Sequence, residues 1–269
     1  MSTTVMDLES SKPDIPAASI AKPAAMEPKE HGAYAILGIP IVTSLIIAGA
    51  SVSGVCIAIA AIAGFLAHEP LLIVWGLRGL RAKRSTPAAR NRLLLLLLVT
   101  LAGGTTALFL GSPAVRWALL VCALLAATSF AVAIAGKHRT LWGQLWGIVG
   151  LSGTCLPILL AGGLAVSTSL ELWTAWMIGF AATTLAVRSV IAAQKRKSRS
   201  LHWAGIGVLS IVVAALTVSS YSLAIVALPM LATSWYLLFA PPSAKHLRRV
   251  GWSLVACTIT SAVWMIVVS

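Results

Sequence analysis

Long uninterrupted hydrophobic runs dominate this chain, and short polar stretches separate them. A helix that crosses the hydrocarbon core of a bilayer needs about 20 mainly apolar residues. From position 33 onward there are nine runs of about that length: 33–50, 53–77, 92–111, 114–136, 141–164, 168–191, 201–218, 221–240 and 247–268. Backbone groups within lipid must be hydrogen-bonded internally, so each run is expected to be an α-helix. The pattern predicts an all-α, polytopic membrane helix bundle with about nine transmembrane helices.

The connections between the runs alternate in charge. Those after the second, fourth, sixth and eighth runs are basic, at 78–92, 137–139, 195–199 and 245–249. Those after the odd-numbered runs are nearly uncharged, and only Arg116 adds a positive charge there. Lys and Arg concentrate in cytoplasmic loops. This alternation predicts a cytoplasmic N-terminus and a C-terminus outside.

The first 27 residues differ from the rest of the chain. They are rich in Ser, Pro and Ala and carry a few acidic residues. The basic start and apolar centre of a secretory signal are missing. We therefore expect a disordered cytoplasmic tail over 1–27, followed by one transmembrane helical domain over 28–269.

The composition supports a lipid-facing exterior. Hydrophobic residues make up 59% of the chain and charged residues 10%, with a mean hydropathy of +0.94, whereas soluble domains carry about 25% charged residues. The formal net charge of +13 could suggest nucleic-acid binding. The basic residues, however, lie between apolar runs and form no basic face interleaved with aromatic residues, so we exclude a nucleic-acid partner. The four cysteines show neither metal-binding nor disulfide spacing.

Few carboxylates occur beyond the tail, and Glu69 is the one placed near the middle of a hydrophobic run. It lies beside His68 and before Pro70, which removes a backbone donor and bends the helix. An ionisable group at this depth costs several kcal/mol unless it is paired or hydrated. Two interpretations remain open: a proton-handling or ligand-binding pair that faces the bundle interior, or a buried ion pair with an Arg on another helix. Glu171 is expected to lie at the outer membrane interface.

A second Glu-His pair, Glu30 and His31, stands where the tail enters the membrane. It could meet His68 and Glu69 at the cytoplasmic mouth of the bundle, or it could be a simple interfacial anchor. These four residues are the candidate acid–base catalytic groups. Two His and two Glu could hold a divalent metal, but the spacing does not require one, and we predict no metal site.

Arg188 lies inside the sixth run and, by helical spacing, shares a face with Lys195 and Arg199. Arg78 and Arg81 are neighbours at the end of the second helix. Two basic helix ends that face one cavity would suit an anionic head group such as a phosphate or carboxylate. Alternatively, these cations extend to the aqueous boundary. Arg188 is deeper and needs a partner, and Glu69 is the expected one. The candidate ligand-binding residues are Arg78, Arg81, Arg188 and Lys195.

The entry motif PKEHGAY at 28–34, followed by Pro40, resembles the start of the YwiC-like family of bacterial membrane proteins. The stretches at 69–72, 188–189 and 248–251 are similar to that family too. The resemblance covers essentially the whole membrane domain. It implies a multi-pass protein of the bacterial cytoplasmic (inner) membrane, and it indicates a topology more than an activity.

The layout is also similar to that of the UbiA-type intramembrane prenyltransferases. In that superfamily the polar stretches after the second and sixth helices carry Asp-rich motifs that hold magnesium and the prenyl diphosphate. Here the corresponding stretches, 76–81 and 188–197, contain no Asp. This departure argues against magnesium–diphosphate chemistry. It leaves open a UbiA-like shell whose basic residues bind an anionic lipid directly.

Three hypotheses follow. The first is a protein that binds an amphipathic or isoprenoid-like ligand through its anionic head in a cytoplasm-facing cavity. If it is an enzyme, it is a UbiA-like transferase with altered chemistry. This hypothesis expects the candidate residues to line one pocket. The second is a small-solute transporter with a Glu-His proton-coupling pair, which expects a polar path across the membrane. The third is a non-enzymatic assembly factor without an internal cavity. The residues indicate neither a cofactor nor an oligomeric state.

Overall fold

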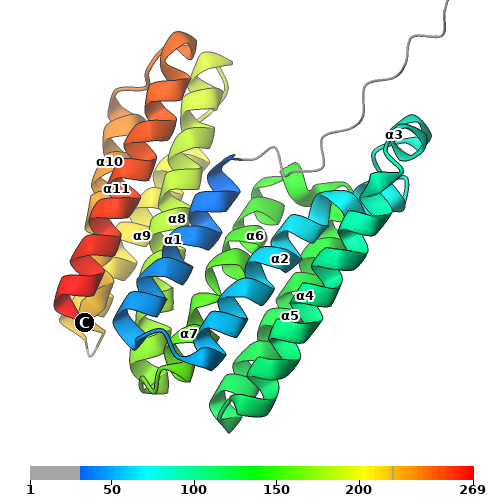
Figure 1. The fold of residues 1–269 in the computed structure, drawn as a ribbon. Helices are drawn as coiled ribbons and strands as arrows, with labels where there is room; N and C mark the ends of the chain where they lie inside the picture. The colour runs from blue at the N-terminus through cyan, green and yellow to red at the C-terminus, as the bar shows by residue number, and fades with distance from the viewer. Residues whose placement is uncertain (1–30, 220) are drawn as a thin grey trace, which may run out of the picture.

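The computed structural model describes residues 31–219 and 221–269 and is helical throughout that part of the chain (Figure 1). The tail expected over 1–27 lies outside the described residues. The α-helices are α1 His31–Ala48, α2 Val52–Val74, α3 Leu80–Ser85, α4 Ala88–Leu110, α5 Pro113–Ile134, α6 Leu141–Ser152, α7 Cys155–Ala161, α8 Val166–Gln194, α9 Ser200–Val218, α10 Leu228–Phe239 and α11 Leu247–Val268. Short 3-10 helices are η1 Lys137–Arg139, η2 Ser222–Ala227 and η3 Ala244–His246.

The nine hydrophobic runs each become one helical pass. Among the described residues, eight helical segments are long and apolar enough to cross a membrane, and the apolar part of α1, Gly32–Ala48, is shorter. Two passes are composite: α6 with α7, and η2 with α10. The 18 residues of α1 rise about 27 Å, close to the roughly 30 Å of the hydrocarbon core. The predicted polytopic membrane bundle is confirmed.

The fifth pass is interrupted between α6 and α7, where the sequence has Gly153 and Pro157. Proline lacks the N–H that would donate to the carbonyl four residues earlier, that of Gly153. The Cys122 thiol of α5 lies 3.5 Å from this carbonyl oxygen and donates to it, and the Leu156 N–H also donates to it, at 3.1 Å. The break is therefore compensated by a neighbouring helix and by a local turn.

All four basic loops lie at one end of the bundle, as their alternation predicted. Arg188 of α8 bonds to the Arg139 carbonyl of η1, and Gln194 bonds to the Pro242 carbonyl before η3. We call this the basic end and define it by residues 75–87, 135–140, 195–199 and 240–247. The C-terminus lies at the other end, opposite α3 (Figure 1). That other end, the bare end, includes the connections 49–51, 111–112 and 162–165.

At the bare end, the charged side chains satisfy backbone groups locally. Arg116 Nε donates to the carbonyls of Leu108 and Gly111, at 2.9 and 3.1 Å, where α4 terminates. Glu171 accepts the N–H of Leu223 at the start of η2. Both contacts match the polarity of helix ends, since cations suit C-termini and carboxylates suit N-termini.

The two halves of the bundle are joined through the fifth pass, which consists of α6 and α7. Helix α7 packs against α1, α2, α5 and α8, whereas α6, its basic-end counterpart, packs against α1, α5 and α8. The most extensive helix pair is α2 with α4, where Gly103 permits close approach: a Cβ there would lie 2.7 Å from the Cys56 carbonyl oxygen.

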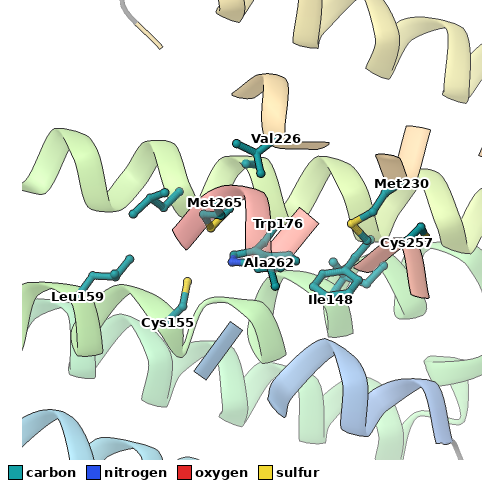
Figure 2. Packing of buried hydrophobic residues seen from close by; sticks show 12 residues of the cluster. Ile148, Cys155, Leu159, Trp176, Val226, Met230, Cys257, Ala262 and Met265 are labelled. Atoms are coloured by element: carbon teal, nitrogen blue, oxygen red, sulfur yellow. The ribbon is translucent and has the colours of Figure 1, made fainter. Parts of the chain in front are cut away.

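The other half has a continuous hydrophobic core. One cluster joins α6, α7, α8, η2, α10 and α11 around Trp176, as Figure 2 shows for Ile148, Cys155, Met230 and Met265. The Trp176 and Phe180 rings stack with centroids 5.5 Å apart. This cluster packs the α8–α11 half of the bundle against α6 and α7.

Candidate ligand-binding cavity

A cavity of about 1580 Å³ is lined by residues of α1, α2, α4, α5, α6, α7, α8 and α11. Small-molecule sites usually have a volume of roughly 300–1,000 Å³, so this space is large. On α5 the lining residues run from Leu119 to Ala133, a rise of about 20 Å. One leaflet of the hydrocarbon core is about 15 Å thick. The cavity is therefore long enough for the tail of a lipid.

Charge in the cavity is confined to its basic end. Among the described lining residues the charged ones are Glu69, Arg78, Arg139, Arg188 and Arg248. Deeper in, the walls are apolar or carry small hydroxyl groups, for example Leu97, Leu101, Thr100 and Ile57. The cavity is amphipathic: its basic end, which we call the mouth, is cationic, and its body is mainly apolar.

Glu69 is buried, with 5% of its surface exposed, and it forms an ion pair with Arg78. Arg78 Nε lies 3.0 Å from Glu69 Oε2, and Arg78 Nη2 contacts Oε1, so the pair is bidentate. The chain after α2 turns back at Gly76 (φ +78°) and Gly79 (φ +93°), a backbone region that glycine occupies without steric cost. This two-glycine turn brings Arg78 over the end of its own helix.

The expected pair of Glu69 with Arg188 is wrong, because Arg78 occupies the carboxylate from the loop that follows α2. Arg188 Nη1 instead donates to Gln144 Oε1 at 2.8 Å and to the Arg139 carbonyl at 3.4 Å. Both acceptors are neutral. Arg188 is thus oriented by hydrogen bonds while its charge is not compensated by any carboxylate of the described residues.

His68 also lines the cavity, next to Phe130 of α5, with ring centroids 5.3 Å apart. His31 opens α1, but its side chain lies outside the described residues, as does all of Glu30. Their neighbours Gly32 and Ala33 line the cavity. Of the four candidate acid–base groups, the structure brings His68 and Glu69 together in the cavity.

Arg81 and Lys195 lie at the basic end but outside the cavity lining, and both are exposed. The expected common face of Arg188, Lys195 and Arg199 is not formed, because α8 ends at Gln194 and Arg196 takes a positive φ of 52°. Arg199 precedes α9, donates to Ser189 Oγ at 2.8 Å and also donates to the Leu238 carbonyl. It joins α8 to α10 and does not face the cavity.

Sequence reasoning missed three polar residues of the cavity: Arg139, Gln144 and Arg248. Gln144 is the amide within the fifth hydrophobic run, and an amide in such a run is the sequence feature that could have identified it. Arg139 and Arg248 are ordinary members of basic loops, so nothing local distinguishes them from their neighbours. Only their position in the cavity lining, together with Arg188, distinguishes Arg139 and Arg248 from the other basic loop residues.

The described residues include no group of three or more His, Cys, Asp or Glu that could hold a metal ion. The metal hypothesis also involved Glu30 and His31, whose side chains are not described. The expectation of no metal site therefore stays a prediction.

Residues 28–158 match a family model described as YwiC-like protein. No curated protein and no solved structure matches the chain. The match runs from the entry motif through α6 into α7 and includes Glu69, Arg78, Arg139 and Gln144, whereas Arg188 and Arg248 lie beyond it. The UbiA-type layout gains no support from these comparisons. Over its first half the chain is a multi-pass membrane protein similar to the YwiC-like family.

Proposed function

We propose that this is a YwiC-like protein of the bacterial cytoplasmic membrane that binds an amphipathic ligand with an anionic head group in the cavity. The head lies at the basic end and the tail, an acyl or isoprenoid-like chain, lies among the apolar walls. One observation carries the proposal: four guanidinium groups and one carboxylate gather at the basic end of a cavity whose remaining walls carry no charged residue of the described chain. By the positive-inside rule this mouth opens to the cytoplasm.

Extension of cations toward the aqueous boundary accounts for Arg81 and Lys195 but not for Arg188. Long side chains at a helix end reach water without entering a cavity. Arg188 lies nearly two turns before the end of α8, is half-buried, and is held toward the cavity by Gln144. A cation kept at this depth needs compensation, and an anionic head group supplies it.

The alternative functions find less support. A proton-coupled transporter expects ionisable groups along the path, but the charged lining residues of the described chain all lie at the basic end, and the deeper polar groups are neutral hydroxyls. An assembly factor expects no internal cavity. An enzymatic role would add His68 and Glu69 as acid–base groups beside the bound head, and ligand binding does not depend on it.

Native mass spectrometry with lipid identification tests the proposal on the full chain purified in a mild neutral detergent. Wild type is expected to retain a defined anionic lipid, and Arg188→Ala is expected to lose it. Lys195→Ala is the matched control, because it removes one exposed cation from the same end outside the cavity. Retention of the same lipid by Arg188→Ala, or no defined lipid on folded wild type, overturns the proposal.

A further inference from the structure

The cationic mouth is divided into two unequal sides. On the α2 side, Arg78 is paired with Glu69, so the formal charges cancel. On the opposite side, Arg139, Arg188 and Arg248 line the cavity, and no ion pair to them occurs within residues 31–219 and 221–269. An anion at Arg78 would have to compete with a buried carboxylate and would be repelled by it. The second side attracts an anion without that competition.

The three arginines without an ion pair in the described chain come from three different elements, of which α8 packs against α11 and bonds to η1 through Arg188 and the Arg139 carbonyl. Arg139 ends η1, Arg188 lies in α8, and Arg248 lies in the first turn of α11. Their neighbours in the chain belong to one hydrophobic cluster, in which Val190 and Val250 are buried and against which Leu141 packs. This packing fixes the backbones that carry the three guanidinium groups at one corner of the cavity.

The Arg188 guanidinium is oriented by hydrogen bonds that leave several of its N–H donors unused in the described chain. Within the described chain its hydrogen bonds involve Nη1 alone. A guanidinium has five N–H donors, so those on Nε and Nη2 are left for a ligand. The Nε and Nη2 edge is the fork that binds two oxygens of one phosphate or carboxylate group.

We infer that Arg139, Arg188 and Arg248 form the head-group site and that this site selects a phosphate monoester over a carboxylate. The inference rests on the proposed function and specifies its ligand. A phosphate monoester carries a charge of about −1.5 to −2 at neutral pH and three strong acceptor oxygens. Its three acceptor oxygens equal the three guanidinium groups in number, and it compensates more of their positive charge than a single negative charge does. A carboxylate offers one charge and two oxygens, and it leaves more of the site uncompensated.

Two amphiphiles with the same tail, hexadecyl phosphate and palmitate, test the head-group preference. Each is titrated into the full chain in neutral detergent, and the bound fraction is measured by native mass spectrometry. Hexadecyl phosphate is expected to bind at least about tenfold more tightly, the equivalent of one additional charge-assisted hydrogen bond. Equal affinities would overturn the preference for phosphate. A third titration with inorganic phosphate distinguishes the source of the anion: displacement of hexadecyl phosphate at equal concentration would show that free phosphate is the ligand.

Matched variants locate the site. Arg188→Gln, Arg139→Gln and Arg248→Gln are each expected to weaken hexadecyl phosphate binding about tenfold. The double variant Glu69→Gln/Arg78→Gln removes a charge pair without altering net charge and is expected to change the affinity less than about threefold, because no net charge at the mouth is lost. A loss in the double variant as large as in Arg188→Gln would overturn the assignment to the three arginines. Melting curves in detergent establish that each variant is folded.

The same titrations separate the inference from the function beneath it. If folded wild type binds neither amphiphile saturably, the proposed function fails. If both amphiphiles bind with equal affinity and Arg188→Gln weakens both equally, the anionic-ligand function stands and the phosphate preference falls.

Discussion

The two sides of the cavity mouth use the same guanidinium group for opposite purposes. Arg78, in the turn after α2, is paired with a carboxylate nine positions earlier on α2, and the pair is neutral and bidentate. Arg188 is held by an amide 44 positions away, and its charge is left intact. A carboxylate partner neutralises the charge of the guanidinium and stabilises the local fold. An amide partner orients the guanidinium and leaves its charge available to an anion. The difference supports our proposal that Arg188 binds the ligand, whereas Arg78 stabilises the fold.

The largest expected effect comes from breaking the neutral pair. Arg78→Ala leaves Glu69 buried without its partner, which for a fully buried pair costs about 3–5 kcal/mol. The Arg78 side chain is 35% exposed, so water replaces part of the interaction. We expect the free energy of unfolding to fall by about 2 kcal/mol, measured as a lower melting temperature in detergent.

Arg81→Ala is the control for this variant, since Arg81 is an exposed cation at the same end of the bundle. It should melt within experimental error of wild type. Glu69→Gln/Arg78→Gln should recover most of the lost stability, because no charge is left unpaired. If Arg78→Ala melts as Arg81→Ala does, the pair does not stabilise the fold.

The next largest effect is expected when Arg188 is given a carboxylate partner, as Arg78 already has. Gln144→Glu places a carboxylate where Arg188 Nη1 now meets an amide oxygen, 2.8 Å away. We expect hexadecyl phosphate affinity to fall about tenfold while thermal stability is maintained, because Arg188 gains a permanent counter-charge. The control is Gln194→Glu, which adds the same charge at the basic end outside the cavity lining. Unchanged affinity in Gln144→Glu would show that Arg188 does not hold the head group.

A smaller effect is expected from the turn that delivers Arg78. Gly76 has a φ of +78°, and no atom lies within 4 Å of the Cβ that a substitution would add, so Gly76→Ala is a purely conformational change. A non-glycine residue in this backbone region costs roughly 1–2 kcal/mol, and we expect a stability loss of about 1 kcal/mol. Gly207→Ala is matched in open space but lies in helix α9, where alanine is favoured. Equal melting temperatures for the two variants would contradict a role for the turn.

Features decided by local pattern could be predicted from the sequence. The nine hydrophobic passes and the gathering of basic loops at one end follow from run length and charge, which need no tertiary contacts. The importance of Glu69 could also be predicted, since a carboxylate inside a hydrophobic run must be satisfied. The partner of Glu69 could not be predicted. An arginine after α2 is expected to extend to the aqueous boundary, and only the chain reversal at Gly76 brings Arg78 back to Glu69.

The proposed head-group site is built from residues of separate elements, so it was only partly predictable from the sequence. Arg188 could be recognised by its depth. Gln144, Arg139 and Arg248 become neighbours of Arg188 only when η1, α8 and α11 pack around Leu141, Val190 and Val250. No spacing within one helix encodes that arrangement. The same reason explains the wrong common face of Arg188 and Arg199: the spacing rule assumed a helix that continues past Gln194, where α8 ends.

The smallest expected effect is a gain of binding, and it tests whether the two sides share one electrostatic environment. Glu69→Gln removes the charge that neutralises Arg78 but keeps an oxygen that can accept its hydrogen bond. A fourth uncompensated guanidinium then faces the mouth, and we expect hexadecyl phosphate affinity to rise about threefold, since the added charge lies across the cavity from the head. Glu171→Gln is the matched control, because it changes net charge equally at the bare end, where Glu171 meets the Leu223 N–H. A gain in both variants would reveal a general charge effect on the whole protein. A gain in Glu69→Gln alone would show that the Glu69 carboxylate keeps the α2 side neutral, and that this neutrality directs the head group to Arg188.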